Sequence, residues 1–524
     1  MTGTDADPLR TERIEPQCVS QVNHPATTKW SSIADILQNA PDWLRAVHAA
    51  GPSAYKRAES GAVAIPSSNQ AFRVYAAYAL AVLPLLWVAA INGFPLLFSD
   101  SGGYLRTGTE QYFPLDRPAS YGLLLLPFYT LGGLWAAVVA QAAFVTWLIA
   151  RTLRAVVGRC SPGRLFGTTA ALAAGSSLPW FVGQIMPDLF AGVVGLLVYL
   201  LVCADDRLAR WERIAFPLLL AGIIACHLSF VPIAIGATVA AMLCAFRTVR
   251  RAVVWSGSAR AAGAIVLAVL GLSTMNLIAE HQFRPSLNSN KFLLARLLDA
   301  RIAQPVIADA CAKRPLSICA MLPALDRADE PLPGQAYLWD PLSQRGAIER
   351  RDPARLDADE ATIIRRTFAA RPGAIARMVW SSWVRQIGTA QEGDGMVHYD
   401  ADMQVSHQIA THFSRSWRAW QGSREQAGTL QSLAIIPEHV VTMLFILATL
   451  AIGGIAFWRR ADRLGAFAVV MLVTLLANAA ACGVLSGVFD RYQARISWLL
   501  PLVAIVAIQS RWQRRGIGGV SSTR

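Results

Sequence analysis

The sequence predicts an all-α polytopic membrane protein with about ten transmembrane helices and a mainly α-helical domain outside the membrane. Of its 524 residues 54% are hydrophobic and only 16% are charged, whereas about a quarter of a soluble protein's residues are charged. The apolar residues gather in runs of the roughly 18 to 25 residues that a helix needs to cross a bilayer. These runs do not alternate with a period of two, so a transmembrane β-barrel is not expected.

The hydrophobic runs divide the chain into five regions. We predict a cytoplasmic N-terminal tail at 1–71, a transmembrane module at 72–280, an extracytoplasmic domain at 281–435, C-terminal transmembrane helices at 436–510 and a cytoplasmic tail at 511–524. The predicted spans are residues 74–94, 131–150, 164–181, 184–203, 212–227, 229–246, 261–280, 436–457, 464–487 and 493–510. The first run follows a polar segment and is expected to act as an uncleaved signal-anchor.

The placement of arginines predicts the orientation of these spans. The short loops that would face the cytoplasm contain Arg151, Arg154, Arg159, Arg164, Arg207, Arg210, Arg213, Arg247, Arg250, Arg251, Arg260, Arg459, Arg460 and Arg463. Cytoplasmic loops of membrane proteins carry such an excess of positive charge. We therefore expect a multi-pass protein of the inner membrane with both termini in the cytoplasm. The net charge of +14 is explained in this way, and nucleic-acid binding is not expected.

The same rule decides how the start of the transmembrane module is interpreted. Residues 121–150 are long enough for two short helices, but two spans there would reverse the orientation of every later loop. We therefore predict a first outer loop at 95–120 and a surface helix at 121–130, followed by one true span.

Two of the eight cysteines, Cys311 and Cys319, lie in the predicted outer domain. An extracytoplasmic compartment permits disulfides, so the sequence predicts a Cys311–Cys319 bridge. The alternative is a pair of buried free thiols.

Two carboxylates stand at predicted outer ends of spans. Asp100 lies in Phe98-Ser-Asp-Ser-Gly-Gly-Tyr104, and Asp188 follows Pro187 at the start of a later span. A carboxylate at the membrane surface suits a general base or, at Asp100, a ligand for a divalent metal ion such as Mg²⁺ or Mn²⁺. The structural alternatives are a capping turn at Asp100 and a favourable helix start at Pro187-Asp188.

Three cationic or titratable residues are predicted at the same face. His227 falls in a very short turn, and Arg491 and Arg495 enter the last span. An arginine at the edge of the membrane suits a bidentate grip on phosphate. The alternatives are a hydrogen-bonded helix-end histidine and a structural ion pair of the arginine with Asp490 or another acid. If the acids and the arginines converge, they form an active site for a lipid-anchored phosphate substrate.

The stretch Asp100-Ser-Gly-Gly-Tyr104-Leu, followed by Arg117-Pro-Ala-Ser-Tyr121-Gly-Leu-Leu-Leu-Leu and later by Pro187-Asp188, resembles the N-terminal half of the GT-C membrane glycosyltransferases. Protein O-mannosyltransferases and the aminoarabinose transferases of lipid A belong to this superfamily. The resemblance covers roughly residues 72–246 and departs from the family pattern at Ser101 and Ala119.

The resemblance implies a transferase that moves a sugar from a polyprenyl-phosphate donor to an extracytoplasmic glycolipid, glycan or protein. It implies Asp100 as base or metal ligand and Asp188 as a second acid. Tyr104 and Arg117 are the motif residues expected to contact substrate or phosphate. Two other functions stay open: a transporter or flippase for an envelope lipid, and a non-catalytic protein whose outer domain binds a partner.

Overall fold

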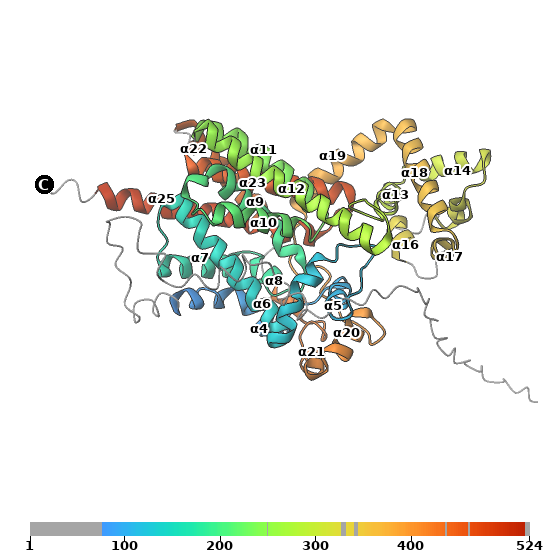
Figure 1. Cartoon of the computed structure of the whole chain (residues 1–524), viewed down its shortest axis with the longest axis horizontal. Helices are drawn as coiled ribbons and strands as arrows, with labels where there is room; N and C mark the ends of the chain where they lie inside the picture. Colours follow the sequence, from blue (N-terminus) through green and yellow to red (C-terminus); the bar gives the residue numbers. More distant parts are fainter. Residues whose placement is uncertain are drawn as a thin grey trace, which may run out of the picture. The chain divides into compact units, whose positions relative to one another are not determined.

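The computed structural model describes residues 76–248, 250–325, 332–339, 344–434, 438–459 and 462–518. Every regular element in these ranges is a helix, apart from an isolated parallel bridge between Leu96 and Gln184 (Figure 1). The predicted all-α class is therefore correct for the described residues. The predicted tail at 1–71 lies outside them, as do residues 519–524 of the second tail.

The helices before the predicted outer domain are η2 (Leu83–Leu86), α4 (Trp87–Asn92), α5 (Ser101–Glu110), α6 (Ser120–Val157), α7 (Pro162–Gly175), α8 (Leu178–Val182), η3 (Pro187–Leu189), α9 (Phe190–Cys203), η4 (Asp205–Arg207), α10 (Glu212–Ile224), α11 (Phe230–Thr248) and α12 (Arg251–Glu280). Those after them are α13 (Ser289–Asp299), α14 (Gln304–Lys313), η5 (Ser317–Met321), α15 (Leu322–Leu325), α16 (Pro333–Trp339), α17 (Gln344–Arg351), α18 (Pro353–Ala370), α19 (Pro372–Gly388), α20 (Gln404–His412), η6 (Ser414–Ser416), α21 (Trp417–Gln421), η7 (Leu430–Leu433), α22 (Glu438–Arg459), α23 (Arg463–Leu485), α24 (Asp490–Ser497) and α25 (Leu499–Gly518).

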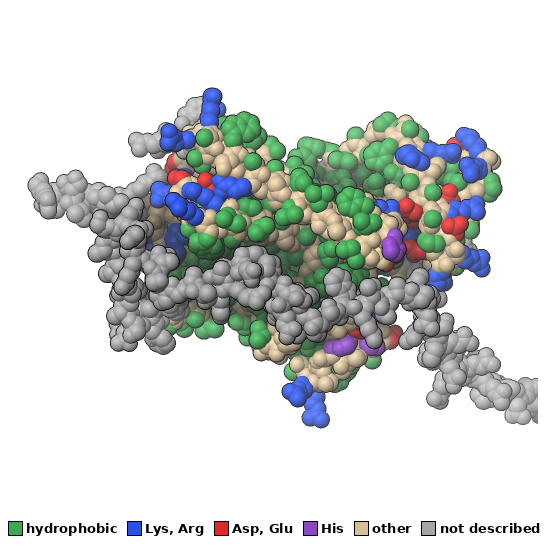
Figure 2. All heavy atoms as spheres, in the orientation of Figure 1, with side chains coloured by type: hydrophobic (Ala, Val, Ile, Leu, Met, Phe, Trp, Pro, Cys, Tyr) green, Lys and Arg blue, Asp and Glu red, His purple; other side chains and the backbone are tan. Residues whose placement is uncertain are grey.

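Five stretches of the described chain are long and apolar enough to cross a membrane: Ser120–Val157, Phe230–Arg247, Arg251–Glu280, Arg463–Leu485 and Asp490–Trp512. Hydrophobic side chains cover the face that α11 and α12 present in Figure 2. Leu243 and Ile278, for example, are about 60% exposed (61% and 62%). Apolar faces of this extent on a helix bundle indicate contact with lipid rather than water, so the chain is a membrane protein.

The other predicted spans coincide with shorter helices. Three of them overlap the apolar helices Ala76–Asn92, Pro187–Cys203 and Val440–Ile455. The remaining two, 164–181 and 212–227, overlap α7 and α10, which have 14 and 13 residues. The prediction of about ten spans therefore stays a prediction beyond these five.

Helix α6 bends where the sequence analysis separated a surface helix from a span. Gly132 and Gly133 have non-helical backbone angles, and Gly133 has a φ of +64° that favours glycine. The helix divides there into a first part that contains residues 121–130 and a second part that contains the predicted span at 131–150. Whether the first part lies on the membrane surface is a prediction that the structure leaves open.

The described helices bury two hydrophobic cores. One joins the apolar helices: α11 packs against α9, α12 and α23, and α23 also contacts α22 and α19. The second is smaller and lies among α13, α14, η5 and α18, where Leu294, Ile307 and Ile363 are buried (Figure 1). Cys311 and Cys319 form a disulfide next to this second core, which confirms the predicted bridge.

Candidate functional site

The segments that carry Asp100 and Asp188 are joined by backbone pairing. The amide of Leu96 donates to the carbonyl of Gly183 over 2.9 Å, and the amide of Ile185 donates to the carbonyl of Leu96 over 2.9 Å. The hydroxyl of Ser101 adds a hydrogen bond of 2.9 Å to the carbonyl of Ile185. Two motifs 88 positions apart in the sequence therefore lie side by side.

Asp100 precedes the first residue of α5, but its side chain does not cap the helix. One carboxylate oxygen lies 3.0 Å from Nη1 of Arg117, and the other lies 3.6 Å from Nη2 of Arg491. The Asp100 side chain keeps 29% of its surface exposed. The capping-turn alternative does not describe this carboxylate, which stands between two guanidinium groups and remains accessible.

Arg117 is held in place from several directions. Its Nη1 also donates to the backbone carbonyl of Asp100 over 2.9 Å, and its Nη2 lies 2.6 Å from the carboxylate of Asp116. Its guanidinium carbon stands 5.6 Å from the ring centroid of Tyr104. Arg117 is thus a rigid cation that bridges two acids.

Tyr104 packs beside this site and is not accessible to a bound molecule, because only 1% of its surface is exposed. Its ring packs edge-on against Tyr121 at 5.1 Å. Burial raises the pKa of its hydroxyl, and the charges of Arg117, Asp100 and Asp188 act on the same group. Tyr104 therefore stays neutral at physiological pH and lies near both acids.

Arg491 covers the opposite side of Asp100. Its guanidinium carbon stands 3.9 Å from the ring centroid of Phe98 and 5.1 Å from that of Tyr492. Its backbone amide donates to the Asp394 carboxylate over 3.1 Å. The Nη1 of Arg491 is buried and makes no hydrogen bond with any described residue. A buried donor without a partner is costly, so this nitrogen is the strongest sign of a bound anion or water at the site.

Asp188 and Arg495 form a second ion pair, with 2.8 Å between Oδ1 and Nη1. The exposed fractions of the two side chains are 1% and 0%. The remaining donors of Arg495 reach Oδ1 of Asn478, the hydroxyl of Ser229 and the sulfur of Cys482. Arg495 therefore forms a structural ion pair, as the alternative to phosphate binding predicts. Its partner is Asp188 and not the neighbouring Asp490.

His227 is attached to this pair through Ser229. Its Nδ1 accepts the backbone amide of Ser229 over 3.2 Å and lies 2.7 Å from the Ser229 hydroxyl. That hydroxyl accepts from Nη2 of Arg495 over 3.0 Å. Because Nδ1 accepts an N–H, it carries no proton. His227 therefore orients the serine that supports Arg495.

The arrangement bears on the metal prediction for Asp100. Within the part of the chain that the structure describes, no three His, Cys, Asp or Glu side chains are grouped so as to hold a metal ion. Both oxygens of Asp100 face guanidinium groups. Metal binding by Asp100 stays a prediction.

Sequence reasoning missed two residues that hold the site together. Asn478 lies in the middle of α23 and accepts two hydrogen bonds from Arg495; an amide inside an apolar run was the available signal. Glu425 is fully buried and accepts the backbone amide of Leu97 over 3.1 Å. Nothing in the sequence around Glu425 distinguishes it from the exposed acids of the predicted outer domain.

Comparisons with protein families, with curated proteins and with solved structures found no match for this chain.

Proposed function

We propose that this protein is a GT-C-type membrane glycosyltransferase that moves a sugar from a polyprenyl-phosphate donor to an extracytoplasmic acceptor. The observation that carries the proposal is the accessible carboxylate of Asp100 between Arg117 and Arg491. A base beside two cations is the combination that transfer from a phosphate carrier requires. In this proposal the protein lies in the inner membrane, has about ten spans and keeps both termini in the cytoplasm.

A narrow groove of mixed polar and apolar character beside Arg117 supports a lipid-linked donor. Its apolar side is formed by Phe113, Pro114, Leu228, Leu272 and Met275, and its polar side includes Asp116, Arg117, Asn276 and Glu280. Its free volume is about 30 Å³, so an occupant would have to widen it. A guanidinium beside apolar walls suits a phosphate that carries a hydrocarbon chain.

The proposed chemistry is a single displacement at the anomeric carbon of the sugar. Asp100 takes the proton of the acceptor hydroxyl while the acceptor oxygen bonds to that carbon. The bond from the carbon to the phosphate oxygen breaks, and the polyprenyl phosphate leaves with its electron pair. Arg491 Nη1, which lacks a partner among the described residues, and Arg117 stabilise the departing negative charge.

The proposal is tested by substituting Asp100. Asp100→Asn is expected to lower transfer by at least about 100-fold, because general-base catalysis typically contributes that much. Asp357→Asn is the matched control, since the Asp357 side chain is 35% exposed and pairs with Arg284 at 3.3 Å but belongs to neither the site nor the groove. Envelope glycans and glycolipids are compared by mass spectrometry in cells that produce no protein, wild type or either variant.

The outcome separates the proposal from its main alternative. A product that depends on the protein and disappears only with Asp100→Asn supports the transferase. Unchanged glycans and glycolipids in cells that lack the protein would favour a non-catalytic protein whose outer domain binds a partner.

A further inference from the structure

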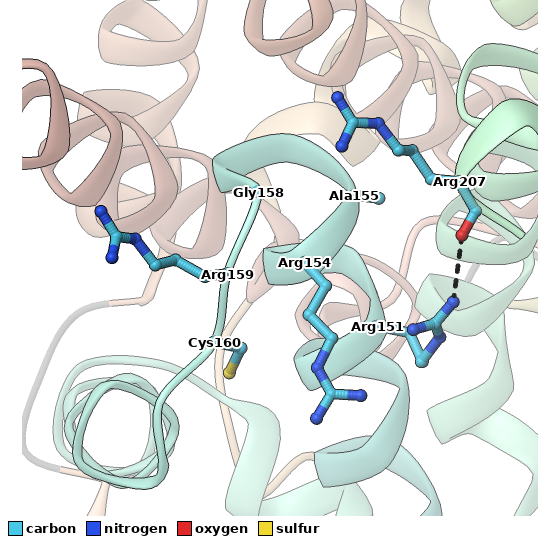
Figure 3. A pocket seen from close by; sticks show the side chains of 7 residues that line it. All are labelled: Arg151, Arg154, Ala155, Gly158, Arg159, Cys160 and Arg207. Carbon is cyan, nitrogen blue, oxygen red and sulfur yellow. Dashed lines mark hydrogen bonds between the residues drawn. The ribbon is translucent and has the colours of Figure 1, made fainter. Parts of the chain in front are cut away.

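A second charged site lies at the far end of α6 from Asp100. It consists of Arg151, Arg154, Arg159 and Arg207, which we call the arginine basin, and these side chains line an open cavity of about 410 Å³ (Figure 3). The part of α6 after the bend, from Leu134 to Val157, has 24 residues and so spans about 36 Å. That length exceeds the roughly 30 Å of a bilayer core, so if this part of α6 spans the membrane, the basin faces the surface opposite the Asp100 cluster.

The cavity has no negative charge of its own. Ala155, Gly158 and Cys160 complete its lining, and no acidic residue contributes to it. Arg159 is exposed and its side chain makes no ion pair within the described ranges. Arg154 donates a hydrogen bond to the hydroxyl of Tyr78 and has no acidic partner among the described residues. Arg154 and Arg159 are therefore the two basin arginines whose charge no described acid neutralises.

Two acids stand beside the basin and pair with part of it. Glu212 holds Arg151 of the basin at 2.7 Å. Asp206 lies 2.5 Å from Arg463, outside the basin, and 3.9 Å from Arg207. Even so, Nε of Arg151 is buried without a hydrogen-bond partner among the described residues. In Figure 3 the guanidinium groups of the four arginines stand apart from one another and point in different directions.

The excess of arginines in cytoplasmic loops does not by itself explain why these four arginines line a cavity. The orientation rule needs arginines on the same side of the membrane, but it does not require them to surround a cavity. We propose that the arginine basin binds a phosphate group. Arginine is the side chain best suited to grip phosphate, because its planar fork makes two parallel hydrogen bonds.

An apolar stripe beside the basin favours a lipid as the source of this phosphate. A second cavity, of about 520 Å³, shares Arg151, Arg154 and Arg207 with the first. Its further lining includes the aromatic residues Trp147 and Trp211 and the acids Asp206 and Glu212. From Trp211 the exposed side chains of Ile214 and Leu218 continue along one face of α10. Tryptophan is enriched at the level of lipid headgroups. The phosphate of an anionic phospholipid in the basin would lay its acyl chains along this stripe.

The test uses full-length protein in detergent with equal amounts of phosphatidylglycerol and phosphatidylcholine. Native mass spectrometry counts the lipids retained by wild type, by R159Q/R207Q and by the matched control R210Q. Arg210 belongs to the same loop as Arg207 but lines neither cavity. Wild type and R210Q are expected to retain phosphatidylglycerol preferentially. The double variant is expected to retain about ten-fold less, which corresponds to the loss of one charged hydrogen bond.

A second arm distinguishes the source of the phosphate. Thermal unfolding of delipidated protein is measured with inorganic phosphate and with chloride at equal ionic strength. A phosphate-dependent rise that R159Q/R207Q loses, without any lipid preference in wild type, assigns the basin to a soluble phosphate. The proposal is overturned if the double variant matches R210Q in both arms. Should the double variant unfold in chloride, R159Q alone decides, because the Arg159 side chain supports no described contact.

Discussion

The Asp100 cluster and the Asp188–Arg495 pair are made of the same chemical groups but differ in their surroundings. Asp100 is 29% exposed and shares two cations, one of which has a buried nitrogen without a partner. Asp188 and Arg495 are 1% and 0% exposed, and hydrogen bonds from Arg495 to Asn478, Ser229 and Cys482 use most of its donors. An accessible carboxylate between two cations can do chemistry, whereas an enclosed pair mainly holds helices together. The enclosed pair is itself not fully satisfied, because Oδ2 of Asp188 is buried without a hydrogen-bond partner among the described residues.

The largest expected effect on stability is the loss of the enclosed pair. Asp188→Asn leaves the Arg495 guanidinium buried without its counter-charge, so it should lower the free energy of unfolding by about 3–5 kcal/mol. Asp100→Asn should lower it by less than about 1 kcal/mol, because partly exposed pairs contribute little. Thermal unfolding of the two variants in detergent measures the difference. Equal losses for both would mean that exposure does not separate the two pairs.

Replacing both residues of the enclosed pair should lower the free energy of unfolding less than removing the charge of Asp188 alone. The double variant D188L/R495M removes both charges and fills the space with apolar side chains. It should recover at least about 2 kcal/mol relative to Asp188→Asn, because no unpaired charge remains buried. The same unfolding experiment checks this. No recovery would show that the hydrogen bonds of Arg495 to Asn478 and Ser229 stabilise the fold as much as the ion pair does.

Substitutions at two adjacent glycines of α5 distinguish an effect on helix packing from an effect on the position of the Arg117 side chain. A Cβ at Gly102 would stand 2.9 Å from the backbone nitrogen of Val405, so Gly102→Ala should destabilise the protein by about 1–3 kcal/mol. A Cβ at Gly103 would meet only the Arg117 side chain, at 3.3 Å from Nη1. Gly103→Ala should therefore leave stability within about 1 kcal/mol while lowering transfer, because it displaces Arg117. The reverse pattern would contradict the assigned role of Arg117.

The smallest predicted effect concerns pH and Glu425. Burial raises the pKa of this carboxyl group well above its ordinary value of 4.5, although the Leu97 amide opposes the shift. The native state therefore holds a proton that the unfolded chain loses above about pH 4.5, so stability should fall as the pH rises through the native pKa. Glu425→Gln keeps an acceptor for Leu97 and cannot ionise. Its unfolding midpoint should match wild type at pH 5 and exceed it by a few degrees at pH 9; identical pH profiles would count against a buried protonated carboxyl.

The helical class, the disulfide and the convergence of the motifs could be predicted from the sequence. Long apolar runs predict helices, and the arginine pattern places Asp100 and Asp188 at the same end of their segments. The pairing partners could not be predicted. Whether Arg495 reaches Asp188 or a substrate depends on how helices from opposite ends of the chain pack together, and no local pattern encodes that packing. The same holds for Glu425, whose contact with Leu97 joins segments 328 positions apart.

The most direct test of this account measures stability and transfer together for Asp100→Asn and Asp188→Asn. Mass spectrometry gives the glycosylated product per folded protein, and thermal unfolding in detergent gives stability. Asp100→Asn should unfold at the wild-type temperature and lose at least about 100-fold of the product. Asp188→Asn should unfold at a lower temperature, and the fraction that stays folded should retain transfer. A fully folded Asp100→Asn variant with wild-type product, or folded but inactive Asp188→Asn, would contradict the assignment of Asp100 to chemistry and Asp188 to architecture.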